Sequence, residues 1–93
     1  MLAVGMVIEG KRSNVRISIF GLGYVGTVSG ACFAELGHEV IGVDVNRGKI
    51  EAINAGRSPI IEDGVPERIA RAVAAGRMRA TDDAEAAVAA SDV

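Results

Sequence analysis

The stretch SIFGLGYVGTVSG, residues 18–30, places three glycines at positions 21, 23 and 26. It follows the apolar run VRISIF, residues 15–20, which is typical of a buried strand, and it leads into a helix-compatible segment. Each glycine has a physical role in such a strand-to-helix turn. Gly21 permits the tight turn, Gly23 lets a pyrophosphate lie against the backbone, and Gly26 lets the helix pack close to the sheet. The spacing therefore predicts a phosphate-binding loop.

The start of the following helix would supply the donors. A helix N-terminus offers unpaired N–H groups and a partial positive charge, and the N–H groups of Tyr24 and Val25 are the natural donors to a phosphate. Asp44 stands at the end of EVIGVDV, residues 39–45, which predicts a second buried strand. Its carboxylate would accept hydrogen bonds from the ribose hydroxyls of an adenosine. The alternative interpretation, a glycine turn with a structural aspartate, does not account for the motif, the strand and the helix together.

The charges near Asp44 favour NAD over NADP as the cofactor. A carboxylate at position 44 would repel a 2′-phosphate, although Arg47 lies three residues on and could in principle accept one. Lys49 could reach the cofactor phosphates from the next helix, or it could be an ordinary solvated helix residue.

The rest of the chain alternates helices with strands. The first helix should end at Gly37, with Val25, Val28, Ala31, Cys32 and Leu36 as its buried face. Further elements are expected as helices over 47–55 and 67–75, a loop over 57–66, a third strand over 77–80, a helix capped by Asp82, and the approach to a fourth strand at 91–93. This order predicts an α/β fold, a Rossmann-type parallel sheet with helices on both faces, truncated at the start of the fourth strand.

Length and composition limit the possibilities further. The chain has 93 residues, with 10 basic and 12 acidic ones, so it forms at most one small domain and shows no basic surface for a nucleic acid. We interpret residues 1–14 as an N-terminal extension, too short to span a membrane, and residues 15–93 as the first half of an NAD-binding Rossmann domain. One cysteine permits no internal disulfide, which favours the cytoplasm. No metal site is expected.

Several stretches beyond the glycines resemble a known family. RISIFGLGYVG, GHEVIGVDVN, KIEAINAGRSPIIE and the closing AASDV are similar to the N-terminus of the UDP-glucose/GDP-mannose dehydrogenases, over residues 15–93. The sequences RISIFGLGYVG and GRSPIIE resemble the GDP-mannose 6-dehydrogenases more than the UDP-glucose 6-dehydrogenases. The resemblance implies oxidation of a nucleotide-sugar C6 alcohol to a carboxylate with two NAD, through a thiohemiacetal on a cysteine. It also places cofactor contacts on Tyr24, Val25, Asp44 and Lys49.

The same resemblance places no catalytic residue in this chain, because the family's catalytic cysteine and lysine and its sugar-nucleotide domain would lie beyond residue 93. The chain is therefore expected to be a fragment that is inactive alone, with an open sheet edge that favours a homo-oligomer. Two alternatives stay open: another Rossmann dehydrogenase of the hydroxyacid or 6-phosphogluconate type, and a nucleotide-sensing module without chemistry.

Three other residues invite a functional interpretation. Cys32 is expected to be a buried structural thiol, since it falls on the apolar helix face. His38 follows the helix end and is expected at the surface or as a cap. Glu62 could line the cofactor cleft or stabilise its own loop, in which the family's PxxEPG pattern is replaced here by residues 59–64, PIIEDG.

Overall fold

The computed structural model describes residues 14–93 of the chain. The predicted N-terminal extension therefore lies outside the described residues, except for Asn14. Seven elements follow in the order β1 (Arg16–Phe20), α2 (Tyr24–Glu35), β2 (Glu39–Val43), α3 (Arg47–Asn54), α4 (Val65–Ala74), β3 (Met78–Thr81) and α5 (Ala84–Ala90).

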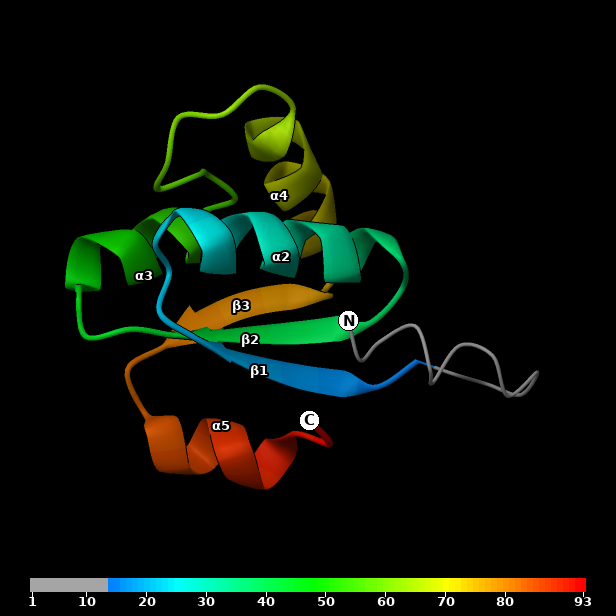
Figure 1. Cartoon of the computed structure of the whole chain (residues 1–93), viewed down its shortest axis with the longest axis vertical. Helices are drawn as coiled ribbons and strands as arrows, with labels where there is room; N and C mark the ends of the chain where they lie inside the picture. Colours follow the sequence, from blue (N-terminus) through cyan, green and yellow to red (C-terminus); the bar gives the residue numbers. More distant parts are fainter. Residues whose placement is uncertain (1–13) are drawn as a thin grey trace.

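The three strands form one parallel sheet in the order β1-β2-β3 (Figure 1). Ile17 pairs with Val40 and Gly42 pairs with Ala80, so all three strands end at the same edge of the sheet. The central strand β2 is buried on both faces, as expected for parallel sheets, whose faces are covered by helices. The edge formed by the carboxyl ends of the strands is where such folds bind ligands.

Helices cover both faces of this sheet. Helices α2, α3 and α4 lie on one face and α5 lies on the other (Figure 1). The larger core is between the sheet and the first three helices and includes Leu22, Val40, Ile53 and Ile69, while Ala87 of α5 packs with Ile41 and Val43 on the other face. The predicted fold class is confirmed.

Helix α2 packs through its smallest side chains, which corrects the predicted apolar face. Its buried residues are Thr27, Gly30, Ala31 and Ala34. A Cβ at Gly30 would lie 3.1–3.4 Å from side-chain atoms of Met78, Ile19 and Val40, so the helix sits too close to the sheet for larger groups.

Of the residues predicted for that face, Ala31 is buried and Val28 packs against the core, but the three others are not buried. Val25 and Leu36 are exposed, and so is Cys32, so the prediction of a buried thiol was wrong. Burial on this helix does not follow hydrophobicity, because the close approach of the helix to the sheet admits only small side chains. The buried Thr27 satisfies its hydroxyl by donating a hydrogen bond to the Leu22 carbonyl.

The later helices differ from the expectation at their starts. Ile50 and Ile53 of α3 are buried as predicted. Helix α4 begins at Val65, so Pro66 lies in its first turn and not in the loop; proline suits this position because the first N–H groups of a helix have no internal partner. The cap of α5 is Asp83, which accepts from Ala86 N at 3.0 Å, and not Asp82.

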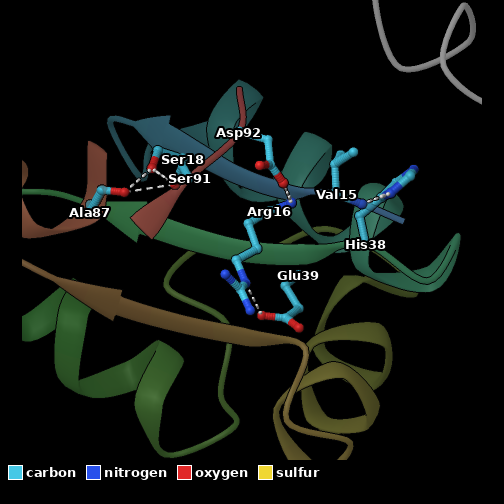
Figure 2. A network of polar contacts seen from close by, with 8 residues as sticks. All are labelled: Val15, Arg16, Ser18, His38, Glu39, Ala87, Ser91 and Asp92. Carbon is cyan, nitrogen blue, oxygen red and sulfur yellow. Dashed lines mark hydrogen bonds and ion pairs between the residues drawn. The ribbon is translucent and has the colours of Figure 1, made fainter. Parts of the chain in front are cut away.

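His38 is buried, with 1 % of its surface exposed, and the prediction of a surface or capping residue was wrong. Its ring lies under the start of β1, where Nδ1 accepts a hydrogen bond from Val15 N at 3.2 Å (Figure 2), and its other face meets Phe33 edge-on. The imidazole thus fills the turn between α2 and β2 and joins it to β1.

The outer edge of β1 contacts the last residues of the chain. Asp92 N and Val93 N donate to the Arg16 carbonyl, and Ser18 N donates to the Val93 carbonyl at 2.9 Å. Side chains reinforce this pairing, because Ser18 and Ser91 hydrogen-bond to each other and to the Ala87 carbonyl (Figure 2). The chain therefore returns from β3, through α5, to the far side of β1, so the sheet reverses its direction of growth at β1, as at a topological switch point.

A side chain occupies part of the opposite edge of the sheet. The Thr81 carbonyl accepts from Asp44 N, just after β2, so the N–H and the carbonyl of Ala80, one residue before, point away from β2. The carboxamide of Asn54, at the end of α3, accepts from Ala80 N at 2.8 Å and donates to Ala80 O at 3.0 Å. One amide thus occupies the place of a neighbouring strand and fixes α3 against β3.

We expect Asn54→Ala to lower the free energy of unfolding by about 1–3 kcal/mol, because both backbone groups of Ala80 lose their partner in a half-buried place. Urea unfolding followed by circular dichroism measures this loss. The control is Glu51→Ala, an exposed position of the same helix, which should stay within about 0.5 kcal/mol of the parent chain. Equal stability of the two variants would contradict the role given to Asn54.

Candidate functional site

The candidate site is built on the glycine loop between β1 and α2. Gly21 adopts φ +97°, a conformation open mainly to glycine, and its N–H donates to the Val43 carbonyl of β2 at 2.8 Å. Leu22 then turns inward and is fully buried against Gly42, where an added Cβ would lie 2.6 Å from the leucine side chain. The loop is therefore anchored to the sheet on its inner side.

Gly26 has the packing role that its spacing predicted, and Gly23 lies beside open space. A Cβ at Gly26 would overlap the carbonyl oxygen of Gly21, so only glycine permits this approach of helix to loop. A Cβ at Gly23 would meet no atom within 4 Å and would project into open space in front of the helix. Position 23 is therefore limited by no neighbouring atom, in contrast to position 26.

The N-terminus of α2 faces the same space. Gly23 is the N-cap residue, no side chain caps the helix, and its first turn carries no acidic residue. The first residues of the helix are accessible, with Tyr24 55 % and Val25 73 % exposed. The unpaired N–H groups and the positive end of the helix dipole are thus available to an anion.

The Asp44 carboxylate joins this loop to the turn after β2. Oδ2 accepts from Leu22 N at 2.7 Å and Oδ1 accepts from Asn46 N at 2.8 Å. These N–H donors, that of Leu22 first and that of Asn46 next, hold the pKa of Asp44 below its ordinary value, and the positive charge of Lys49 lowers it further. Asp44 is therefore ionised at neutral pH, and each oxygen keeps a second lone pair for a hydroxyl donor.

Asn46 sets the direction of the next helix. Its side chain accepts from Lys49 N at 3.0 Å and caps α3. This cap places Lys49 in the first turn of α3, where its charge acts on Asp44. Arg47, in contrast, extends to the end of β3, where its Nη2 lies 3.5 Å from Asp82 Oδ2.

The loop between α3 and α4 approaches the glycine loop from the other side. The negative charge of Glu62 raises the pKa of the Tyr24 phenol, so the SPIIE segment lies beside the start of α2. Ser58 stabilises this segment by bonding to both the N–H and the carbonyl of Ile60. Glu62 therefore lies near the Tyr24 phenol, and whether it lines the cofactor cleft or stabilises its own loop stays a prediction.

The structure brings together all seven residues that the sequence assigned to a cofactor, since they lie on the glycine loop, the start of α2, the turn after β2 and the first turn of α3: Gly21, Gly23, Tyr24, Val25, Gly26, Asp44 and Lys49. Sequence reasoning did not find the capping role of Asn46 or the Arg47–Asp82 pair. The first could have been found from its place before a helix. The second depends on the register of β2 and β3, which brings the residues after Val43 and Thr81 to one edge and is not read from the sequence.

Two negative findings concern residues 14–93 alone. No group of His, Cys, Asp or Glu side chains in this range could hold a metal ion. None of the helices in this range is both long and apolar enough to cross a membrane.

Comparison with known proteins identifies relatives of this arrangement. The profile of the UDP-glucose/GDP-mannose dehydrogenase family, NAD binding domain, matches residues 15–93. GDP-mannose 6-dehydrogenase of Pseudomonas putida is 54 % identical and UDP-glucose 6-dehydrogenase of Rhizobium meliloti is 52 % identical, each over 85 % of this chain and 18 % of the relative. The chain therefore spans about a fifth of the length of these curated relatives.

A solved structure agrees with the sequence relatives. The ternary complex of GDP-mannose dehydrogenase from Pseudomonas aeruginosa superposes with a TM-score of 0.81 at 52 % identity, over 83 % of this chain and 18 % of that one. At this identity the likeness extends beyond the fold to the amino-acid sequence.

We expect Gly26→Ala to destabilise the chain by about 1–3 kcal/mol or more, because its methyl group would overlap the Gly21 carbonyl and push α2 off the loop. Gly23→Ala is the matched variant, since the same methyl group there meets open space, and its unfolding should match that of the parent within about 0.5 kcal/mol. Thermal and urea unfolding of both proteins check this pair. Equal losses in the two variants would show that the loop does not depend on close approach at position 26.

The lowered pKa of Asp44 predicts how stability depends on pH. A carboxyl whose pKa is lower in the folded state contributes stability above its unfolded pKa of about 3.9, and this contribution is lost as the pH falls through the folded pKa. Parent and Asp44→Asn chains should thus differ most at neutral pH and converge on acidification below about pH 4. Urea midpoints between pH 7 and pH 3 measure the difference, and a gap that stays constant would contradict it.

Proposed function

The chain belongs to the UDP-glucose/GDP-mannose dehydrogenase family, and from this membership we propose that it is the NAD-binding portion of a nucleotide-sugar 6-dehydrogenase. Such an enzyme oxidises the C6 alcohol of a sugar nucleotide to a carboxylate, and each NAD, when bound, accepts one hydride. The observation that supports this most directly is the Asp44 carboxylate, held by Leu22 N beside a glycine loop with open space at Gly23. A ribose and a pyrophosphate need these two features side by side.

We assign each contact in the site by its chemistry. The backbone N–H groups of Tyr24 and Val25 would bind the pyrophosphate, with Gly21 and Gly26 shaping the loop and Gly23 leaving room for it. Asp44 would accept hydrogen bonds from the adenosine ribose. The ammonium of Lys49, which acts on Asp44 already, would add a positive charge next to the phosphates.

The sugar nucleotide is GDP-mannose or UDP-glucose in this proposal. Relatives named for either activity match the chain at nearly equal identity, 54 % and 52 %, so the NAD-binding segment does not separate the two substrates. The difference must lie in the parts of the relatives that this chain does not match. We place the reaction in the cytoplasm, and the homo-oligomeric state predicted from the open sheet edge stays a prediction.

Within residues 14–93 we assign no catalytic group. Cys32, the one cysteine, lies in α2 eight residues after Tyr24, which corresponds to about 12 Å along the helix axis. It is thus remote from the end of the helix that faces the site. The proposal therefore gives this chain binding and orientation of the cofactor, and gives the bond-breaking steps to segments it does not contain.

Calorimetric titration of the chain with NAD tests the proposal. We expect weak binding, with a Kd on the order of 1 mM, which corresponds to a binding free energy of about 4 kcal/mol. The reason is that the proposed contacts reach only the ADP half of NAD. Asp44→Ala should weaken binding by roughly tenfold through loss of charge-assisted hydrogen bonds. Gly23→Ala should weaken it as well, although that variant keeps its fold.

Controls separate binding from folding in this experiment. Circular dichroism confirms that each variant is folded, and Glu67→Gln, an exposed change in α4, should bind NAD like the parent. Absence of NAD binding by the folded parent chain, or full binding by Asp44→Ala, would refute the proposed site.

A further inference from the structure

Two carboxylates and one guanidinium meet where β2 and β3 end. Val43 pairs with Thr81, and the next residues, Asp44 and Asp82, follow at the carboxyl ends of these neighbouring strands. Asp44 N also donates to the Thr81 carbonyl at 3.2 Å, which keeps the two chain segments together beyond the strands. Arg47, in the first turn of α3, extends its guanidinium into this region and pairs with Asp82 at 3.5 Å.

The direction in which Arg47 extends matters for the ribose that Asp44 would bind. Arg47 is three residues from Asp44 and is the nearest arginine in the sequence that could neutralise a phosphate at the ribose 2′ position. Both Asp44 oxygens are already bonded to backbone N–H groups, and the ion pair of Arg47 among the described residues is with Asp82. The Arg47 guanidinium therefore pairs with Asp82 and not with Asp44.

We propose that Asp82 is a positioning residue for cofactor choice, which keeps the Arg47 guanidinium at the end of β3 and so denies a cation to the 2′-phosphate of NADP. This inference rests on the proposed function, because it assumes that the adenosine ribose binds at Asp44. It adds to the repulsion by Asp44 a second contribution, from a residue on the next strand. Lys49, in the first turn of α3, places its charge beside Asp44.

The size of the effect follows from the exposure of the pair. The side chains of Arg47 and Asp82 are 72 % and 57 % exposed, and exposed ion pairs contribute little because water and salt screen them. We therefore expect a modest change in cofactor preference that depends on ionic strength, and no change in the fold.

The test compares NAD and NADP binding to the full 93-residue chain at low ionic strength, with NADP measured in competition with NAD. Asp82→Asn keeps the size of the side chain and removes its charge, and it should lower the ratio of the NADP Kd to the NAD Kd by roughly two- to fivefold. Arg47→Gln alone should not lower this ratio. The double variant should behave like Arg47→Gln, since without the guanidinium there is nothing for Asp82 to position.

A charge-matched control and a salt series complete the experiment. Glu67→Gln also removes one negative charge, from the exposed first turn of α4, and should leave the ratio unchanged. Raising the salt concentration to about 0.5 M should abolish the gain of Asp82→Asn, because screening removes interactions between exposed charges.

Three results would overturn the inference, and they are distinguishable. An unchanged ratio in Asp82→Asn, with NAD still bound, would refute the role of Asp82 and leave the proposed function standing. A gain that persists in the double variant would show that Asp82 acts on the phosphate directly and not through Arg47. Failure of the folded parent chain to bind NAD would refute the proposed function and this inference with it.

Discussion

The Asp44 carboxylate holds the ligand-binding edge of this molecule together. It connects the turn after β1 to the turn after β2 through two short hydrogen bonds, to Leu22 N and Asn46 N. Neither turn is part of a helix or strand that could fix its conformation. One ionised side chain, hydrogen-bonded to both turns, holds them in place relative to each other. In the function that we propose, the group that would bind the ribose is thus also the group that fixes the glycine loop, so Asp44 would align the ribose and phosphate contacts.

The close packing of α2 on the sheet has the same effect at longer range. Gly26 and Gly30 let the helix lie directly on β1, β2 and β3, and its first N–H groups are thereby brought level with the strand ends. A larger side chain at either position would lift the helix and move its positive end away from the loop. The unusual burial pattern of α2, small residues inside and valine and leucine outside, follows from this geometric requirement.

Much of this arrangement could be predicted from the sequence, because its determinants are local. Gly21 before a helix and Asp44 at a strand end follow rules of spacing that need no knowledge of the remaining contacts. The failures concern residues whose surroundings come from elsewhere in the chain. Burial of His38 depends on Val15, which precedes the strand β1, and exposure of Cys32 depends on how near the helix lies to the sheet.

The predicted cap of α5 was wrong for a related reason. Asp82 and Asp83 are equivalent as caps by type, and the choice between them is made by Thr81, whose hydroxyl accepts from Asp83 N at 3.0 Å and turns the chain so that Asp83 caps the helix. Asp82 is thereby left for Arg47, a contact across 35 residues that no local pattern encodes. Long-range charge pairs of this kind become predictable only when the strand register is known.

The carboxamide of Asn54 has a consequence for how the sheet can be extended. By occupying the N–H and the carbonyl of Ala80, it removes one pairing position from the outer edge of β3. At the opposite edge, residues 91–93 already bond to β1, so the two edges of this sheet differ in how they are occupied. A strand edge with such a built-in partner is less open to edge-to-edge pairing with a second copy at that position.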